Sequence, residues 1–120
     1  MAEGEAILVL EHNPRNRELL QRCLGQEGYR VLPGDSVEAC ELALSAETVA
    51  LVLVDVAGFD LQVWDCCERL KARHIPFLVL SAHADRRQRE CCLSHGACSV
   101  LDKPVTMHEL LAAVAAMLRT

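Results

Sequence analysis

Five short apolar segments recur along the chain, and longer segments with a helical spacing of apolar residues separate them. The apolar segments are residues 6–10, 29–32, 50–54, 76–80 and 98–101. Continuous runs of Val, Leu and Ile, such as residues 50–54, are typical of strands buried on both faces of a sheet. Residues 29–32 alternate instead, so we expect a more exposed strand there. The pattern therefore predicts five strands.

Helix-start and helix-stop residues mark the segments between these strands. Asn13 followed by Pro14 predicts a helix that begins there, and Gly28 is expected to end it after about residue 27. Near the chain's end, Thr106 and Glu109 have the spacing of a capping box for a last helix that runs to Leu118. A fourth helix is expected around residues 84–95.

The second and third helices are predicted from a turn and from an apolar stripe. We expect the dipeptide Pro33-Gly34 to break the second strand, and Asp35 or Ser36 to cap the helix that follows. The third helix should begin near residue 61, with an apolar face at three-residue spacing formed by Leu61, Trp64, Cys67 and Leu70. On that stripe Trp64 is interpreted as a core residue rather than a binding platform.

Strands that alternate with helices over 120 residues predict a single α/β domain, residues 1–120. Because right-handed crossovers leave few topologies for a chain this short, we expect a doubly wound, five-stranded parallel sheet. Its predicted strand order is 2-1-3-4-5, as in flavodoxin-like three-layer sandwiches.

Composition excludes several classes of protein. A hydrophobic content of 52% with 24% charged residues is typical of a folded globular chain. The formal net charge of −5 argues against direct nucleic-acid binding. No apolar run approaches the roughly 18 residues of a membrane span, and the acidic N-terminus does not resemble a secretory signal. We therefore expect a cytoplasmic protein.

The seven cysteines do not have the spacing of a known framework. Their number is odd, and neither adjacent pair has the two-residue spacer of zinc or thioredoxin motifs. Because cysteine behaves as a small core hydrophobe, we interpret most of them as core residues. A redox or metal-sensing role stays open as the alternative.

Polar residues follow the predicted strands at their carboxyl ends. In this topology the strand ends bring Glu11, His12, Asp55, Ser81 and Lys103 to one edge of the sheet. Two acids can hold a hard divalent cation, and a carboxylate can attack phosphorus to form an acyl phosphate. Lysine and serine can then neutralise and hydrogen-bond the phosphoryl oxygens. The set therefore predicts a phosphoryl-transfer site.

At this point the chain resembles the receiver domain of two-component response regulators, the CheY-like fold. The resemblance covers essentially the whole chain and depends on the order and spacing of several short motifs. They are residues 7–11 before Asn13-Pro14, residues 27–31, residues 52–55, residues 80–82, Gly96-Ala97 and Lys103-Pro104.

The resemblance implies a role for each matching residue. Asp55 is the implied phosphoacceptor, Ser81 the switch hydroxyl, and Lys103 the phosphate-binding lysine with a cis bond to Pro104. Mg²⁺ is implied at Glu11, Asp55 and the backbone carbonyl of Ala57. A histidine kinase or a phosphotransfer protein is the implied donor, and the domain is a signalling phosphoacceptor rather than an enzyme.

Three parts of the chain depart from the family pattern. His12 stands where the family usually has a second acid, so we expect weaker Mg²⁺ binding, with His12 itself either a ligand or a bystander. Val100 occupies the place of the switch aromatic in the fifth strand. The loop after Asp55 carries Gly58-Phe59 and then Val63 instead of Met-Pro and Gly.

These departures leave two interpretations of the function besides the thiol sensor. The first is a phosphorylation-dependent receiver that relays its signal by a conformational change. The second is a degenerate receiver that acts as a phosphorylation-independent interaction module. The expected partners are a donor protein and either a downstream protein or an output domain on a longer chain, and a homodimer is an open alternative.

Overall fold

Five parallel strands form one sheet in the order β2-β1-β3-β4-β5, as the sequence predicts. The computed structural model describes residues 5–57, 62–82 and 85–118. The strands are β1 (Glu5–Leu10), β2 (Val31–Gly34), β3 (Thr48–Asp55), β4 (Phe77–Ser81) and β5 (Ser99–Asp102). Because all five strands are parallel, their carboxyl ends lie along the same edge of the sheet.

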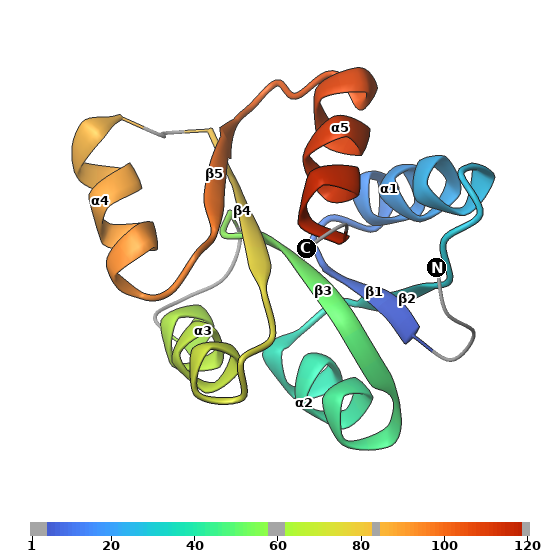
Figure 1. Cartoon of the computed structure of the whole chain (residues 1–120), viewed down its shortest axis with the longest axis horizontal. Helices are drawn as coiled ribbons and strands as arrows, with labels where there is room; N and C mark the ends of the chain where they lie inside the picture. The colour runs from blue at the N-terminus through green and yellow to red at the C-terminus, as the bar shows by residue number, and fades with distance from the viewer. Residues whose placement is uncertain (1–4, 58–61, 83–84, 119–120) are drawn as a thin grey trace.

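Helices cover both faces of the sheet, which gives the predicted three-layer α/β sandwich (Figure 1). They are α1 (Pro14–Gln26), α2 (Val37–Ala46), α3 (Gln62–Ala72), α4 (Arg86–Ser94) and α5 (Met107–Leu118). In Figure 1, α1 and α5 lie together on one side of the sheet, with α2 and α3 on the other and α4 beside β5.

The buried parts of the central strands are continuously apolar because successive side chains enter different cores. On β3, Leu51 and Leu53 pack with buried residues of α1 and α5, such as Leu24 and Leu110. Val52 and Val54 point the other way, into a core shared with α2, α3 and α4. A strand buried on both faces can expose polar groups to a ligand only where it ends, and β3 ends at Asp55.

Side-chain caps fix where the helices begin. Asn13 Oδ1 accepts hydrogen bonds from the backbone N–H groups of Arg15 (2.9 Å) and Asn16 (3.0 Å), as the Asn-Pro motif predicts. Ser36, one of the two expected candidates, caps α2. Thr106 Oγ1 accepts from the backbone N–H of Glu109, which confirms Thr106 as the cap, and its hydroxyl donates to the Glu109 carboxylate.

The predicted end of the second strand was wrong. The strand runs from Val31 to Gly34, and Pro33 pairs in register with Val9. Proline is tolerated here because β2 is an edge strand, where the missing N–H removes no ladder hydrogen bond on the open side. The Gly34 carbonyl accepts from the backbone N–H of Glu11, which carries the pairing to the end of β1.

The apolar face of α3 also differs from the predicted stripe. The buried residues are Val63, Cys66, Cys67 and Leu70, which follow the 3.6-residue period more closely than a strict three-residue spacing. Trp64 is half-buried against this core, and its ring centroid lies 4.9 Å from that of His95. Val63, assigned above to the loop after Asp55, lies within α3, whereas Leu61 and Gly58-Phe59 lie outside the described residues.

Four of the seven cysteines are buried, which agrees with their interpretation as core residues. They are Cys40, Cys66, Cys67 and Cys92, while Cys98 is exposed. All seven are free thiols. No helix among the described residues is both long and apolar enough to cross a membrane.

Two glycines with positive φ offer a matched test of the fold. Gly28 (φ 91°) has open space where a Cβ would stand, whereas a Cβ on Gly96 (φ 104°) would lie 2.9 Å from Lys71 Cβ. We expect Gly28→Ala to lower the free energy of unfolding by about 1 kcal/mol through backbone strain alone. Gly96→Ala should cost roughly 2 kcal/mol or more, because the clash adds to the same strain. Urea unfolding of both variants measures the difference, and equal losses would contradict the predicted contact.

Candidate functional site

Asp55 is the buried carboxylate at the centre of the site. Its side chain is 1% exposed, Oδ1 accepts a hydrogen bond from the backbone N–H of Ala57 (3.0 Å), and Oδ2 forms an ion pair with Lys103 Nζ. A buried carboxylate is costly unless a cation and hydrogen bonds compensate its charge. Here one oxygen is held by the following loop and the other by a residue 48 positions later in the sequence.

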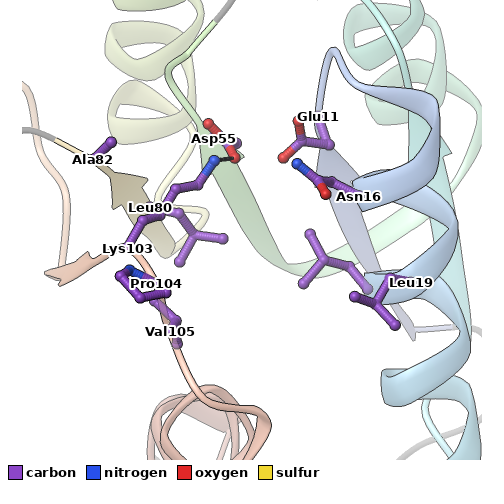
Figure 2. Close-up of a pocket in the computed structure, with 10 residues that line it drawn as sticks. Glu11, Asn16, Leu19, Asp55, Leu80, Ala82, Lys103, Pro104 and Val105 are labelled. Atoms are coloured by element: carbon purple, nitrogen blue, oxygen red, sulfur yellow. Dashed lines mark ion pairs between the residues drawn. The ribbon is translucent and has the colours of Figure 1, made fainter.

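Lys103 reaches Asp55 because the chain turns directly after β5. Its backbone N–H donates to the carbonyl of Ser81 (2.9 Å), which ties this turn to the end of β4. The Lys103–Pro104 peptide bond is cis, as the resemblance implies. Figure 2 shows the Lys103 side chain extending from this turn to the Asp55 carboxylate.

Glu11 is the second buried carboxylate and has a different environment. Its Oε1 accepts from the backbone N–H of Asn13 (3.0 Å), whereas its buried Oε2 has no hydrogen-bond partner among the described residues. Burial is the largest cause that raises the pKa of Glu11 from its ordinary value of 4.5 to about 7, and the Asp55 carboxyl adds to the rise. The Asn13 N–H and the Lys103 charge oppose it.

The backbone that carries Glu11 is held by a contact that the sequence analysis did not identify. Arg17, one turn into α1, donates from Nη1 to the carbonyls of Glu11 (2.9 Å) and His12 (3.3 Å). Because every residue has a backbone carbonyl, such a contact leaves no motif in the sequence. Arg17 therefore positions the loop between β1 and α1.

The other predicted site residues lie at the same edge of the sheet, but they differ in how far they are exposed to solvent. Ser81 is buried at the end of β4, one residue beyond Leu80, the register partner of Asp55. His12 and Ala57 are exposed. No group of three or more His, Cys, Asp or Glu side chains that could hold a metal ion occurs in the described part of the chain, so His12 does not complete a three-residue set with Glu11 and Asp55.

A pocket of about 450 Å³ contains the two buried carboxylates and the lysine (Figure 2). Glu11, Asp55 and Lys103 line its polar end, and side chains of α1, of β4 and of the segment after β5 form its apolar wall. The wall includes Leu19, Leu20, Leu80, Pro104 and Val105. Three of the predicted site residues, Glu11, Asp55 and Lys103, therefore lie in one pocket, as a common site requires.

The strand position expected to hold an aromatic residue is occupied by buried Val100. Arg89 of α4 donates from Nη1 to the Val100 carbonyl (2.9 Å) and from Nη2 to the Asp102 carboxylate (2.6 Å). This guanidinium therefore links α4 to β5 immediately before Lys103. Sequence reasoning identified the missing ring but not this contact.

The donor set fits a hard divalent cation. Mg²⁺ takes oxygen ligands and is commonly bound by one or two carboxylates with the remaining positions filled by water. Glu11 Oε2 is buried and unpartnered, and it lies in the same pocket as the Asp55 carboxylate. Above the raised pKa of Glu11, a cation there would compensate the negative charge that Lys103 alone does not balance.

Comparison with known proteins agrees with this geometry. The family model described as "Response regulator receiver domain" matches residues 7–115. The response regulator MprA of Mycobacterium ulcerans is 40% identical over 116 residues, and its counterpart from Mycobacterium tuberculosis (strain H37Ra) is 39% identical. Each alignment covers 94% of this chain and 50% of the relative, so the chain spans about half the length of these curated relatives.

Solved structures show the same fold. The receiver domain of a signal transduction histidine kinase from Syntrophus aciditrophicus has a TM-score of 0.82 at 28% identity, over 97% of this chain and 90% of that one. The non-phosphorylated HemR receiver domain from Leptospira biflexa has a TM-score of 0.86 at 25% identity, over 97% and 95% of the two chains. With its fold, its family match and its clustered strand-end residues, this chain belongs to the response regulator receiver domain family.

Proposed function

We propose that this chain accepts a phosphoryl group on Asp55 from a histidine kinase or a phosphotransfer protein. The observation that carries the proposal is the ion pair of buried Asp55 with Lys103, in a pocket that also contains the Glu11 carboxylate. A carboxylate held between a cation and a second acid is suited to nucleophilic attack on phosphorus rather than to packing. Ser81 is then the switch hydroxyl.

The transfer is a displacement at phosphorus. An Asp55 oxygen forms the new P–O bond while the bond from phosphorus to the donor's nitrogen breaks, and the product is an acyl phosphate. Lys103 neutralises charge on the phosphoryl oxygens, and Ser81 donates a hydrogen bond to one of them. Glu11, Asp55 and the Ala57 carbonyl would hold Mg²⁺, which supplies further neutralisation of the phosphoryl charge.

The position of His12 supports a weak metal site. Where two acids usually stand, this chain has one buried acid followed by an exposed imidazole. One fewer negative charge lowers the attraction for a divalent cation, and neutral imidazole is a poorer ligand for Mg²⁺ than carboxylate. We therefore propose that this chain binds Mg²⁺ more weakly than receiver domains that have both acids.

The remaining proposals concern the setting of the domain. We infer a cytoplasmic signalling domain with no catalytic activity beyond its own phosphorylation and dephosphorylation. Its donor is a kinase or phosphotransfer protein, and its output is a downstream protein or an attached domain. The net charge of −5 supports protein partners rather than nucleic acid.

The first experiment tests the phosphoacceptor directly. Incubation with acetyl phosphate and Mg²⁺ should add one phosphoryl group per chain, measured by intact mass spectrometry. Asp55→Ala should abolish the addition, because the nucleophile is lost. Asp35→Ala is the matched control, since this exposed acid lies in the turn after β2, and it should leave the addition in place. Absence of phosphorylation in the parent chain would favour the phosphorylation-independent module instead.

The second experiment tests the metal ligand. The pKa of Glu11 is raised from 4.5 to about 7 in the folded chain. The free energy of unfolding should therefore fall as the pH rises from 4.5 through about 7, because the folded chain must give up the proton that keeps this buried side chain neutral. Above that range, Glu11→Gln should raise the melting temperature of the metal-free protein, since it removes an uncompensated buried charge. Mg²⁺ with beryllofluoride should raise the melting temperature of the parent chain and change its Trp64 fluorescence, and the variant should lose most of both responses. An unchanged response in the variant would remove Glu11 from the ligand set.

The third experiment tests the Lys103–Asp55 pair by a double-mutant cycle. Lys103→Met should lower the free energy of unfolding by roughly 1–3 kcal/mol, because it leaves a buried carboxylate without its cation. Asp55→Asn in the same chain should recover most of that loss, since the neutral amide needs no counter-ion. Chemical denaturation of the two single variants and the double variant gives the coupling energy. Additive effects would show that the two side chains do not interact.

A further inference from the structure

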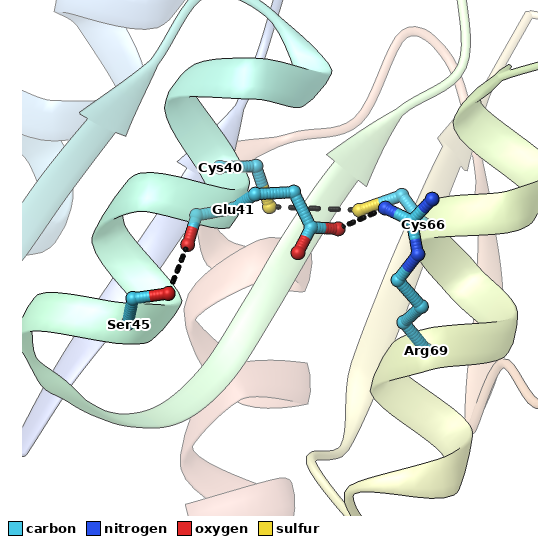
Figure 3. Close-up of polar contacts among 5 residues, drawn as sticks. All are labelled: Cys40, Glu41, Ser45, Cys66 and Arg69. Carbon is cyan, nitrogen blue, oxygen red and sulfur yellow. Dashed lines mark hydrogen bonds and ion pairs between the residues drawn. The ribbon is translucent and has the colours of Figure 1, made fainter.

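Two buried cysteines face one another between α2 and α3. Cys40 Sγ and Cys66 Sγ lie 3.6 Å apart, and both side chains are fully buried (Figure 3). The two residues are 26 positions apart in sequence, on helices that pack side by side on one face of the sheet. Neither takes part in the site around Asp55.

We propose that Cys40 and Cys66 form an oxidisable dithiol that a peroxide converts to a disulfide joining α2 to α3. A disulfide needs its sulfur atoms about 2.05 Å apart, so the pair must approach by about 1.5 Å. Rotation of the two side chains and a small helix shift can supply a movement of that size. The pairing is set by tertiary packing, since the cysteine spacing in sequence matches no redox motif.

The electrostatics of the pair favour one sulfur as the nucleophile. The hydrogen bond between the thiols lowers the pKa of Cys66 and raises that of Cys40. The Arg69 guanidinium, one turn along α3, also lowers the pKa of Cys66, against the opposing effects of burial and of Glu41. Since the thiolate is the reactive form, Cys66 is the sulfur that a peroxide oxidises first.

A groove between the same two helices gives a small oxidant an approach to this region. Its volume is about 290 Å³, and its lining residues are Val37, Glu38, Glu41, Gln62, Asp65 and Arg69. Glu41 and Asp65 directly adjoin the two cysteines in sequence, and the Glu41–Arg69 ion pair (2.5 Å) spans the groove (Figure 3). The groove therefore brings a small oxidant to the sequence neighbours of the two cysteines, and a local opening between α2 and α3 completes the path to the fully buried thiols.

The chemistry balances with hydrogen peroxide as the oxidant. The Cys66 thiolate attacks one peroxide oxygen, the O–O bond breaks, and a sulfenic acid and hydroxide form. The Cys40 thiol gives its proton to that hydroxide, and its sulfur attacks Cys66; the S–S bond forms and the S–O bond breaks. The second hydroxide takes up the proton that Cys66 released. Two thiols thus lose two electrons and two protons, and the peroxide becomes two waters.

The test is a disulfide map of the full chain after treatment with dilute peroxide and alkylation of the remaining thiols. Residues 31–68 contain no Lys or Arg, so trypsin leaves both cysteines on one peptide. A protease that cleaves after glutamate separates them at Glu41 and Glu47. We expect one peptide carrying Cys40 bonded to one carrying Cys66, released by dithiothreitol. We also expect the melting temperature of the oxidised chain to rise by about 5 °C or more.

Cysteine variants show which two sulfur atoms form the disulfide and exclude disulfides formed through other thiols. Cys98→Ser removes the exposed thiol and any dimer bonded through it, and it should keep both the linked peptides and the rise in melting temperature. Cys67→Ala should also keep the linked peptides and the rise in melting temperature, which would show that Cys66 rather than Cys67 forms the disulfide. Cys40→Val should abolish both. Separate alkylation of Cys40 and Cys66 after peroxide treatment, or linkage only through Cys67 or Cys98, would overturn the proposal.

Discussion

Two carboxylates lie buried side by side at the carboxyl edge of the sheet, and one lysine compensates them. Asp55 and Glu11 are 1% and 2% exposed, and Lys103 forms an ion pair with Asp55. Water would stabilise both charges better than this pocket does, so the arrangement costs folding energy. When Glu11 is ionised, the site holds excess negative charge in a fixed geometry, which suits the divalent cation and the phosphoryl chemistry proposed for it. The rest of the structure keeps these three side chains in place.

The two cores provide that rigidity. The buried side chains of residues 7–10 in β1 and 51–54 in β3 are all apolar, and they enter the α1/α5 core and the α2/α3/α4 core in turn. A slip of one residue in either strand would exchange the two sets, so the register is strongly fixed. Since Glu11 and Asp55 follow the last apolar residues of these strands, the register that satisfies the cores also sets the two acids beside one another.

Among the described residues, the departures from the family pattern lie both beside the site and in a core: His12 follows β1, whereas Val63 and Val100 are buried in the α2/α3/α4 core. His12 is exposed and alters the charge of the rim, while Val100 remains buried where an aromatic ring is usual. Arg89 holds the Val100 carbonyl and the Asp102 carboxylate, so α4 and β5 stay connected without that ring. The Cys40–Cys66 contact likewise lies between helices on one face, separate from the phosphoryl site.

The sequence by itself determined the number of strands and the identity of the polar residues at their ends, because apolar periodicity and cap residues are local properties. It also determined the sheet order, because few topologies suit five parallel strands in so short a chain. It placed Glu11, Asp55 and Lys103 on one edge through topology alone. Tertiary structure decided which groups touch: the unpartnered oxygen of Glu11, the anchoring by Arg17 and the facing thiols of Cys40 and Cys66. It also extended β2 through Pro33 and rotated the apolar face of α3. Such contacts depend on how whole elements pack, and a position's neighbours in sequence do not specify its neighbours in space.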